Sequence, residues 1–403
     1  MLKYWLWLTT RKGLGPRGAL LVLRHFSSPK AAYAAGRLEY SAIPGLRSTE
    51  TLLDKDLRLP EQILKNCYEK RISVLTIQDA AYPERLKNIS DPPLVLYWRG
   101  TLPDLNGLVV SVVGTRRASA YGLLQAERMG YSLSRSGCMV ASGLAKGVDT
   151  QAMQGALLGG APVIGVVAGG LDLVYPAENR KMYEDVAQHG CLLSEYPPGT
   201  PYQRSNFPQR NRILSGVSAG VVVVESPEKS GALITASKAL EQGRDVFALP
   251  ANVGVETAAG NLKLLREGAI LACGAEDVLQ EYAALYPLLR VEQNREEPLP
   301  KPVPKKPETP RQEPVKTPEP KKVVDKPENR HYIDLKGCWD ALSADERALA
   351  QLLRQGPRHM DDLTEETKLP SARILASLTL MEVKGLVRRP AARWYALAEA
   401  EEM

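Results

Sequence analysis

From residue 108 onwards, short apolar runs alternate with longer amphipathic stretches, and this alternation constrains the fold more than any other feature. The runs are LVVSVVG (108–114), CMVASG (138–143), PVIGVVAGG (162–170), CLLSEY (191–196), AGVVVVE (219–225), DVFALP (245–250) and AILA (269–272). Runs that are apolar at successive positions are typical of strands buried on both faces of a parallel sheet, with helices covering both faces. We therefore predict an α/β fold with a Rossmann-like doubly wound parallel sheet over about 104–285, in a domain bounded at 81–291.

A small helical domain is predicted for residues 1–80, where the helical pattern is interrupted by the turns GLGP (13–16) and AIPGL (42–46). In helix-hairpin-helix or SAM-like modules, glycines at such turns let backbone amides approach a DNA phosphate. A helical bundle that contacts other proteins explains the same pattern equally well.

The last 69 residues, 335–403, predict a winged-helix-like domain. Ser343 and Glu346 in LSADERALAQLLR form the pattern of a helix N-cap with its capping-box partner. A second helix is predicted near HMDDLTEETKL, a third from Pro370 through Val383, and a β-hairpin in GLVRRPAARWYAL. The third helix carries few cations and the domain has a net charge of −1, so contact with a protein is as well supported as contact with DNA.

A proline-rich segment, 292–334, separates this tail from the larger body. Ten prolines and alternating charges between Glu296 and Arg330 cannot supply a hydrophobic core. We therefore predict an extended, disordered tether whose simplest role is that of a spacer.

The composition indicates a soluble cytoplasmic protein whose cysteines are reduced. The five cysteines and four histidines are scattered without a CxxC pair, which argues against disulfides and a structural zinc site. No stretch of about 20 apolar residues could span a membrane, and the apolar run from Tyr4 to Leu8 is too short for a signal peptide. The net charge of +6 lies mostly in the first 99 residues, so an anion site in the middle of the chain must be local.

The loops that follow the predicted strands predict such a local anion site. In an open α/β sheet, ligands bind where strands end and helices begin. Glycines at these turns bring backbone N–H groups close to an oxyanion, and the following helix adds its positive dipole end. Hydroxyl groups and cations also occur in these loops: Thr115, Ser142, Ser230 and Thr235, with Arg116, Lys146, Arg212 and Lys229. Together they predict a phosphate-binding rim built from several loops, although glycines at turns can also serve helix packing alone.

Two common nucleotide cofactors are not supported by the motifs. The loop GTRRASAYG (114–122) lacks the three closely spaced glycines of a dinucleotide fingerprint, and no GxxxxGK[ST] sequence occurs. We therefore expect no cofactor, no resident metal and no catalytic residue.

Several motifs in order resemble those of the DNA-processing protein A (DprA/Smf) family. They are SVVGTRRASAYG, VASGLAKGVDTQAMQGAL, GGLDLVYPAENRKMYEDVAQHGCLLSEYPPGTP, FPQRNRILSGVSAGVVVVES, KSGALITASKALEQGRDVFALP and GNLKLLREGA, which together cover about 105–280. The resemblance implies a dimeric protein that binds single-stranded DNA, protects it after uptake in natural transformation, and loads the RecA recombinase. It implies no enzymatic activity. Met153 stands near a position where the family usually has histidine, and Thr115 replaces a frequent serine.

The resemblance also implies which residues grip the DNA backbone. They are Gly114, Thr115 and Arg116 in the first loop, Ser142 and Gly143 in the second, Lys229, Ser230 and Gly231 in the fifth, and Arg210, Asn211 and Arg212 beside them. Lys146 from the rim completes the predicted site.

Two alternatives use the same fold. Lysine-decarboxylase-like phosphoribohydrolases cleave a base from a nucleoside monophosphate with a PGGxGTxxE motif. The corresponding loop here, EKSGALITASKALE, lacks the double glycine and leaves Glu241 too far along its helix for acid–base work. The other alternative is a scaffold that acts through its terminal domains and no longer binds DNA.

Overall fold

A computed structural model describes residues 1–289 except 48, and residues 342–398 except 392. The chain divides into two compact units, 1–297 and 298–403, which are described separately. The proline-rich segment predicted as a tether lies outside the described residues, as does Cys338.

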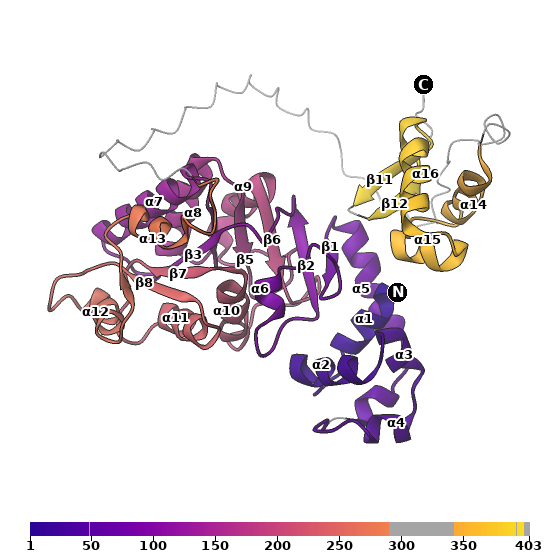
Figure 1. The fold of residues 1–403 in the computed structure, drawn as a ribbon, viewed down its shortest axis with the longest axis horizontal. Coiled ribbons are helices and arrows are strands. Elements are labelled where there is room, and N and C mark those ends of the chain that lie inside the picture. Colours follow the sequence, from indigo (N-terminus) through magenta and orange to yellow (C-terminus); the bar gives the residue numbers. More distant parts are fainter. Residues whose placement is uncertain (48, 290–341, 392, 399–403) are drawn as a thin grey trace, which may run out of the picture. The chain divides into compact units, whose positions relative to one another are not determined.

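The first unit is built on a nine-stranded sheet with the order β1-β2-β6-β5-β4-β3-β7-β8-β9 (Figure 1). All pairs from β6 to β9 in this order are parallel. These strands are β3 (Val109–Val113), β4 (Met139–Ser142), β5 (Val163–Val166), β6 (Gly190–Ser194), β7 (Gly220–Val223), β8 (Asp245–Ala248) and β9 (Ile270–Leu271). Each falls on one of the seven apolar runs, so the predicted Rossmann-like parallel sheet is confirmed.

Two further strands, β1 (Ser73–Thr76) and β2 (Val95–Gly100), were not predicted. They extend the sheet beyond β6 and both pair antiparallel, with Val74 opposite Tyr97 and Tyr97 opposite Ser194. An antiparallel pair needs no crossover helix, so these strands do not continue the strand–helix alternation from which the others were predicted. The sheet is therefore mixed at this edge.

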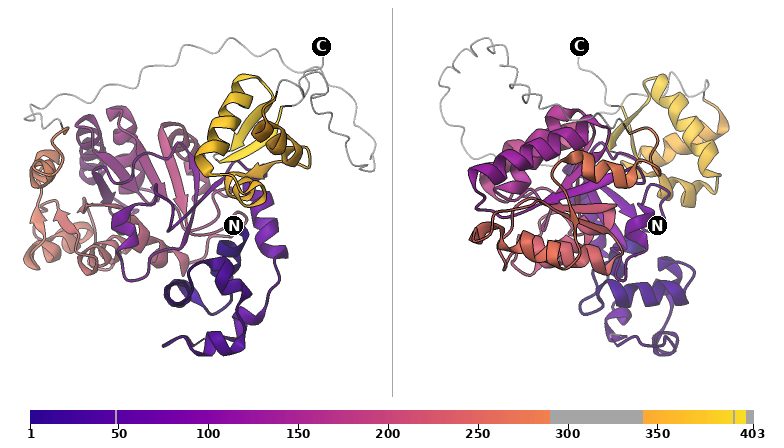
Figure 2. Two further views of the ribbon diagram at one scale, coloured as in Figure 1. Left: turned by 45° about the vertical axis from the view of Figure 1, so that its right-hand side comes forward. Right: turned by 60° about the vertical axis from the view of Figure 1, so that its left-hand side comes forward.

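Helices cover both faces of the sheet (Figures 1 and 2). One layer contains α7 (Ala120–Arg135), α8 (Val148–Gly159), α9 (Arg180–His189) and α13 (Ala275–Tyr282), and the other contains α6 (Glu84–Lys87), α10 (Asn206–Val217), α11 (Gly231–Glu241) and α12 (Ala259–Arg266). Helices α7 and α8 touch backbone to backbone: a methyl group on Gly130 would lie 1.9 Å from the Ala152 carbonyl oxygen. Short 3₁₀ turns occur at Glu50–Leu53, Ala177–Asn179 and Glu256–Ala258.

The order of the strands reverses at β3, and this reversal positions the site. From β3 the chain proceeds outward through β4, β5 and β6, and it then returns to pair β7 on the other side of β3. The helices after β3 and β7 consequently leave towards opposite faces, which opens a crevice between their first residues.

Short helices precede the sheet: α1 (Leu2–Thr9), α2 (Gly15–His25), α3 (Pro29–Ala34), α4 (Arg37–Ser41) and α5 (Arg58–Glu69). The predicted helical character of this region is confirmed. Buried residues of these helices, such as Trp7 and Tyr40, belong to the same continuous apolar core as Tyr97 of β2. The expected boundary at residue 80 falls between β1 and α6, and independent folding of residues 1–80 stays a prediction.

In the described part of the second unit there are three helices, α14 (Ala344–Leu353), α15 (Met360–Thr367) and α16 (Ser371–Val383). A small antiparallel sheet of β10 (Arg358–His359), β12 (Trp394–Leu397) and β11 (Val387–Ala391) packs with them. The capping box predicted for α14 is present, because Ser343 accepts from the Glu346 N–H and Glu346 accepts from the Ser343 N–H. Three helices followed by a β-hairpin form the winged-helix arrangement expected from the sequence.

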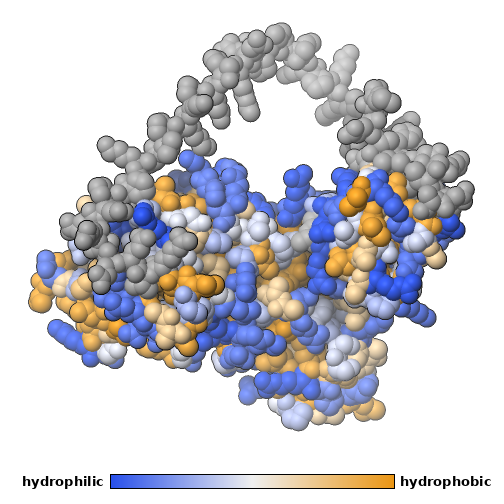
Figure 3. All heavy atoms as spheres, turned by 45° about the horizontal axis from the view of Figure 1, so that its top comes forward, coloured by the Kyte–Doolittle hydropathy of each residue, from blue (hydrophilic) through white to orange (hydrophobic). Residues whose placement is uncertain are grey.

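Hydrophilic and hydrophobic side chains are intermixed on the face shown in Figure 3. Within the described residues, no helix has the length and apolar character needed to cross a bilayer. The buried Cys138 and Cys191 lie in the core.

Candidate functional site

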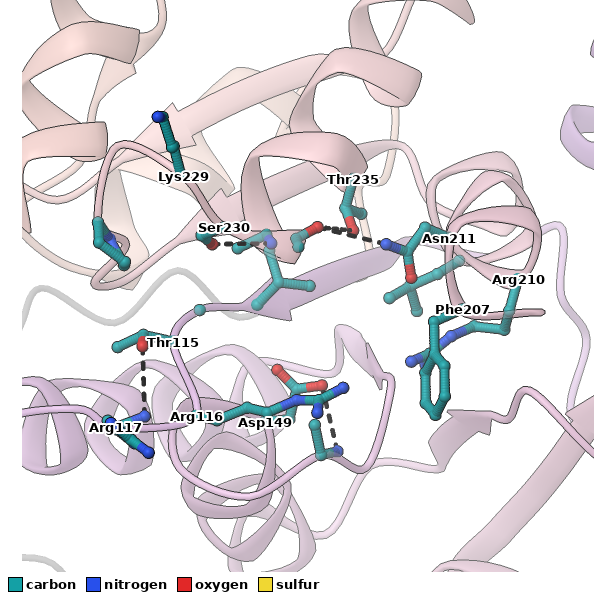
Figure 4. A pocket seen from close by; sticks show the side chains of 17 residues that line it. Thr115, Arg116, Arg117, Asp149, Phe207, Arg210, Asn211, Lys229, Ser230 and Thr235 are labelled. Carbon is teal, nitrogen blue, oxygen red and sulfur yellow. Dashed lines mark hydrogen bonds between the residues drawn. The ribbon is translucent and has the colours of Figure 1, made fainter. Parts of the chain in front are cut away.

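A cavity of about 340 Å³ lies in the crevice where β3 and β7 end (Figure 4). Its walls come from the loop after β3, the loop after β4, one face of α10 and the first turn of α11. The chain reversal at β3 places these segments together, although they are separated by up to about a hundred residues in sequence. The cavity thus lies at the carboxyl edge of the sheet, where the sequence predicted a phosphate-binding rim.

The loop after β3 is held in a fixed conformation. Gly114 has no room for a side chain, because a methyl group there would lie 2.6 Å from Val148. The Thr115 N–H donates to the Glu225 carbonyl at 2.7 Å, and the Arg117 N–H donates to the Thr115 hydroxyl at 3.2 Å. The Thr115 and Arg117 amides therefore bond within the protein, and this loop offers the side chains of its arginines to the cavity.

Arg116 points into the cavity from this loop. Its guanidinium lies over the ring of Phe207, 5.4 Å from the ring centroid. The aromatic contact orients the side chain without neutralising its charge, which stays available to an anion.

The opposite wall is the start of α11, an 11-residue helix. Ser230 is its N-cap and accepts from the Ala232 N–H at 3.0 Å, while Ser226 donates to the Ser230 hydroxyl at 2.8 Å. Lys229 is exposed at the rim, and no carboxylate pairs with it in the part of the chain that the structure describes. The positive end of a helix dipole and an unpaired ammonium group thus face the same cavity.

Helix α10 supplies the floor of the cavity. Arg210 is 5% exposed, and its Nη1 donates to the Val166 carbonyl at 2.6 Å. Its Nε has no hydrogen-bond partner among the described residues. Burial lowers the pKa of this guanidinium from its ordinary value, and the neighbouring Asp149 carboxylate opposes that shift. Asn211 Nδ2 donates to the Gly231 carbonyl at 3.3 Å and ties α10 to α11.

Asp149 is a carboxyl group inside this predominantly cationic site. It is 6% exposed and accepts from the Ala145 N–H at 3.3 Å and from the Gly114 N–H. Burial raises the pKa of Asp149 above its ordinary value of 3.8, whereas Arg210 lowers it. Asp149 therefore fixes the loop after β4 and also lines the cavity.

The structure brings together eight of the twelve predicted site residues: Gly114, Thr115, Arg116, Arg210, Asn211, Lys229, Ser230 and Gly231. Thr235 also lines the cavity, and its hydroxyl donates to the Gly231 carbonyl at 3.3 Å. Arg117 and Phe207 line it as well but were absent from the predicted set. The sequence signal available for Arg117 and Phe207 was that they lie close to Arg116 and Arg210 along the chain.

The other four predicted residues do not line the cavity. Ser142 is fully buried and donates to the Val112 carbonyl, and Gly143 lies beneath the Arg210 guanidinium. Lys146 is exposed and pairs with Glu178 at 2.8 Å. Arg212 is buried and pairs with Glu195 and, more distantly, Asp91. Each is occupied by a contact within the protein that the sequence did not reveal.

The remaining acidic residues near the rim are also engaged elsewhere. Glu225 accepts from the Ser119 N–H and hydroxyl, which fixes the start of α7. Asp172 accepts from Gly199 N–H and pairs with Lys70. Glu241 lies at the far end of α11 from the cavity and pairs with Lys238. No group of histidine, cysteine and carboxylate side chains suited to a metal ion occurs within the described ranges.

The fold combines a Rossmann-like sheet, a cavity lined by arginine and lysine side chains at the carboxyl edge of that sheet, and a winged-helix unit. Residues 73–283 match the family described as DNA recombination-mediator protein A, and residues 340–392 match the DprA winged helix domain. The chain belongs to the DNA recombination-mediator protein A family.

Individual relatives agree with this assignment. The chain is 42% identical over 225 residues to the DNA processing protein DprA of Bacillus subtilis, covering 56% of this chain and 75% of the relative. It is 34% identical over 279 residues to DprA of Streptococcus pneumoniae, covering 69% of this chain and 98% of the relative. The X-ray structure of the Streptococcus pneumoniae protein superposes with a TM-score of 0.63 at 33% identity, covering 70% of this chain and 98% of that structure.

Proposed function

We propose that this protein binds the sugar–phosphate backbone of single-stranded DNA in the crevice between β3 and β7 and leaves the strand intact. The observation that carries the proposal is Arg210, a buried guanidinium that lines the cavity and whose Nε has no hydrogen-bond partner among the described residues. A buried donor without an acceptor is costly, and a phosphate oxygen would offset that cost. Arg116 and Lys229 stand on either side to neutralise the same charge.

The size of the cavity favours a single strand. A volume of about 340 Å³ accommodates the phosphate and sugar of a nucleotide but not two paired strands. Contacts to the backbone carry no base information, so binding should tolerate any sequence. The membership of a family of DNA-processing proteins supports the same ligand class.

The position of the carboxyl groups explains why the bound strand should not be cleaved. General acid–base chemistry needs a carboxyl group within hydrogen-bond reach of the reacting atom. Among the described residues that line the cavity, Asp149 is the sole carboxyl group, and two backbone amides and the nearby guanidinium of Arg210 hold it in place. We assign it a structural role in orienting Arg210.

Incubation of the full-length protein with labelled oligonucleotides and with nucleoside monophosphates tests the proposal. We expect retention of single strands in preference to duplexes of equal length, with every oligonucleotide recovered at full length and no free base formed. Release of base from a nucleoside monophosphate would instead support the phosphoribohydrolase alternative. Absence of binding to any of the oligonucleotides would support the scaffold alternative.

The wider role that we propose is that of a recombination mediator in the cytoplasm, which protects incoming single strands during natural transformation and loads RecA onto them. Its test is the rate of RecA filament formation on protein-coated strands, which should rise with the wild-type protein and fail to rise with an Arg116→Ala/Lys229→Ala variant. An equal rate with both proteins would contradict a mediator role that depends on this crevice.

We also propose a homodimer formed through the Rossmann-like part of the chain. Three apolar side chains near one end of the sheet, Ile234, Leu240 and Leu271, are 40–59% exposed. Burial of such side chains against a second copy would stabilise a dimer. Light scattering should give twice the chain mass, and Leu240→Glu/Leu271→Glu should give the monomer; a wild-type monomer at micromolar concentration would contradict the dimer.

A further inference from the structure

Three aromatic rings from separate segments lie together next to the cavity. Tyr175 follows β5, Tyr202 lies between β6 and α10, and Phe207 belongs to α10. The rings of Tyr175 and Tyr202 are stacked, with centroids 5.2 Å apart and planes 29° from parallel. Phe207 lies 5.6 Å from Tyr175 and 6.3 Å from Tyr202. We call Tyr175, Tyr202 and Phe207 the aromatic shelf.

A buried tyrosine beneath the shelf holds it in place. Tyr183 of α9 is 1% exposed, and its hydroxyl donates to the Tyr175 carbonyl at 2.9 Å. The Tyr202 hydroxyl lies 3.2 Å from the Tyr183 hydroxyl and donates to the Leu173 carbonyl at 3.4 Å. The Tyr202 ring also packs on Gly169, where a methyl group would lie 3.0 Å from a ring carbon. Both tyrosines are therefore positioned before any ligand arrives.

The shelf is continuous with the anion site. Phe207 lines the cavity and contacts the Arg116 guanidinium. The aromatic shelf therefore starts directly beside the proposed phosphate position. Tyr175 at the outer end is 43% exposed, which leaves part of its ring open to solvent. Arg204, two residues beyond Tyr202, is exposed and pairs with no carboxylate in the part of the chain that the structure describes.

We propose that Tyr175 and Tyr202 continue from Phe207 as a base-stacking surface for the nucleotides that adjoin the phosphate in the crevice. This inference rests on the proposed binding of single-stranded DNA and adds the course of the strand, which leaves the cavity across α10 towards the loop after β5. Every base has an aromatic face, so the surface accepts any sequence. Paired bases are stacked inside a duplex, so the surface selects unpaired strands.

Stacking and charge neutralisation respond differently to salt, which separates this surface from the anion site. Phosphate contacts release counterions, so their loss changes the slope of affinity against salt concentration. Stacking releases none, so its loss lowers affinity at every salt concentration by the same factor. An oligonucleotide without bases can use the anion site but not the aromatic shelf.

The experiment compares Tyr175→Ala and Tyr175→Phe with the wild-type protein on oligothymidylate and on an abasic oligonucleotide of the same length. Tyr175→Ala should lose roughly tenfold in affinity for oligothymidylate, because an alanine removes one stacking partner. Its affinity for the abasic strand and its salt slope should not change, and Tyr175→Phe should match the wild type. Tyr131→Ala on α7 is the control for loss of a partly exposed tyrosine away from the shelf.

Two results would overturn the proposal: an unchanged affinity of Tyr175→Ala for oligothymidylate, or an equal loss on the abasic strand. A strand containing 2-aminopurine gives a second readout on the wild-type protein, because stacking on a tyrosine quenches its fluorescence and an unquenched bound strand would also refute the shelf. Failure of the proposed function would give a different result. The Arg116→Ala/Lys229→Ala variant would then bind both the oligothymidylate and the abasic oligonucleotide with wild-type affinity.

Discussion

The Arg210 guanidinium lies directly against the Cα of Gly143, so closely that a methyl group on Gly143 would be 2.0 Å from Nη1. Gly143 follows β4, and Arg210 reaches it from α10. Gly143 thus acts on the anion site by leaving room for the arginine. The resemblance implied that Gly143 grips the DNA backbone, whereas in the structure Gly143 leaves room for the Arg210 side chain.

Gly143→Ala should therefore weaken binding of single-stranded DNA without touching the ligand. The methyl group would displace Arg210 from its place in the cavity, and loss of one charge-assisted contact corresponds to roughly tenfold in affinity. Fluorescence anisotropy with a labelled oligonucleotide measures the effect. Gly36→Ala is the control, because the nearest atom to its added methyl group is 3.9 Å away. Equal affinity of both variants would contradict the assigned role of Arg210.

The Arg212→Ala substitution should lower the free energy of unfolding and should not remove a ligand contact. Arg212 is 5% exposed and pairs with the largely buried Glu195. Removing one partner of a buried pair leaves the other charge uncompensated, which costs about 3–5 kcal/mol. Chemical denaturation should show this loss for Arg212→Ala and almost none for Arg116→Ala, whose effect should fall on DNA binding alone. The reverse pattern would place Arg212 in the binding site.

Acidification should tighten DNA binding through Asp149. Burial raises the pKa of this carboxyl above 3.8, with Arg210 and Arg116 opposing the shift. As the pH falls towards the raised pKa, Asp149 takes up a proton and the cavity loses its negative charge. Protonation also stabilises the folded state relative to the unfolded state, and this contribution is lost as the pH rises through the folded-state pKa.

Asp149→Asn should then bind DNA more tightly at neutral pH and show a flatter dependence of affinity on pH. Titrations from neutral pH downwards at constant ionic strength measure both effects. Identical pH profiles for the two proteins would show that another group titrates.

Helix α16 should contribute nothing to DNA affinity, although it occupies the position of a recognition helix. Its exposed face is apolar, with Leu375, Leu380 and Val383 46–82% exposed. Its cations are engaged, since Arg373 pairs with Asp345 and Lys384 at its end pairs with Glu346. Leu375→Glu/Val383→Glu places two negative charges on this face and should leave affinity for single and double strands within about twofold. A large drop would show that the face lies against phosphate.

Much of the fold was predictable because buried parallel strands need apolar residues at successive positions. The strand Val109–Val113 and its parallel neighbours follow from this requirement alone. Strands β1 and β2 were missed because an antiparallel edge pair needs neither a crossover helix nor a long apolar run. The pairing of β2 with β6 depends on a contact between segments about a hundred residues apart.

The site was predictable at the level of loops but not of side-chain direction. Arg210 and Arg212 are two residues apart on α10, which turns them about 200° from one another around the helix. One therefore faces the cavity and the other faces Glu195. Helical spacing contained that signal, whereas the pairing of Lys146 with Glu178 arises only in three dimensions.

The most direct test of the account is the salt dependence of single-strand affinity for the wild-type protein and for Arg116→Ala/Lys229→Ala, with Arg128→Ala on the outer face of α7 as the control. Each phosphate contact contributes about 0.7 to the slope of log affinity against log salt for single strands. We predict a lower affinity and a slope reduced by roughly 1 to 1.5 in the double variant, with no change in the control. A double variant that keeps the affinity and slope of the wild type would show that the crevice between β3 and β7 does not hold the DNA backbone.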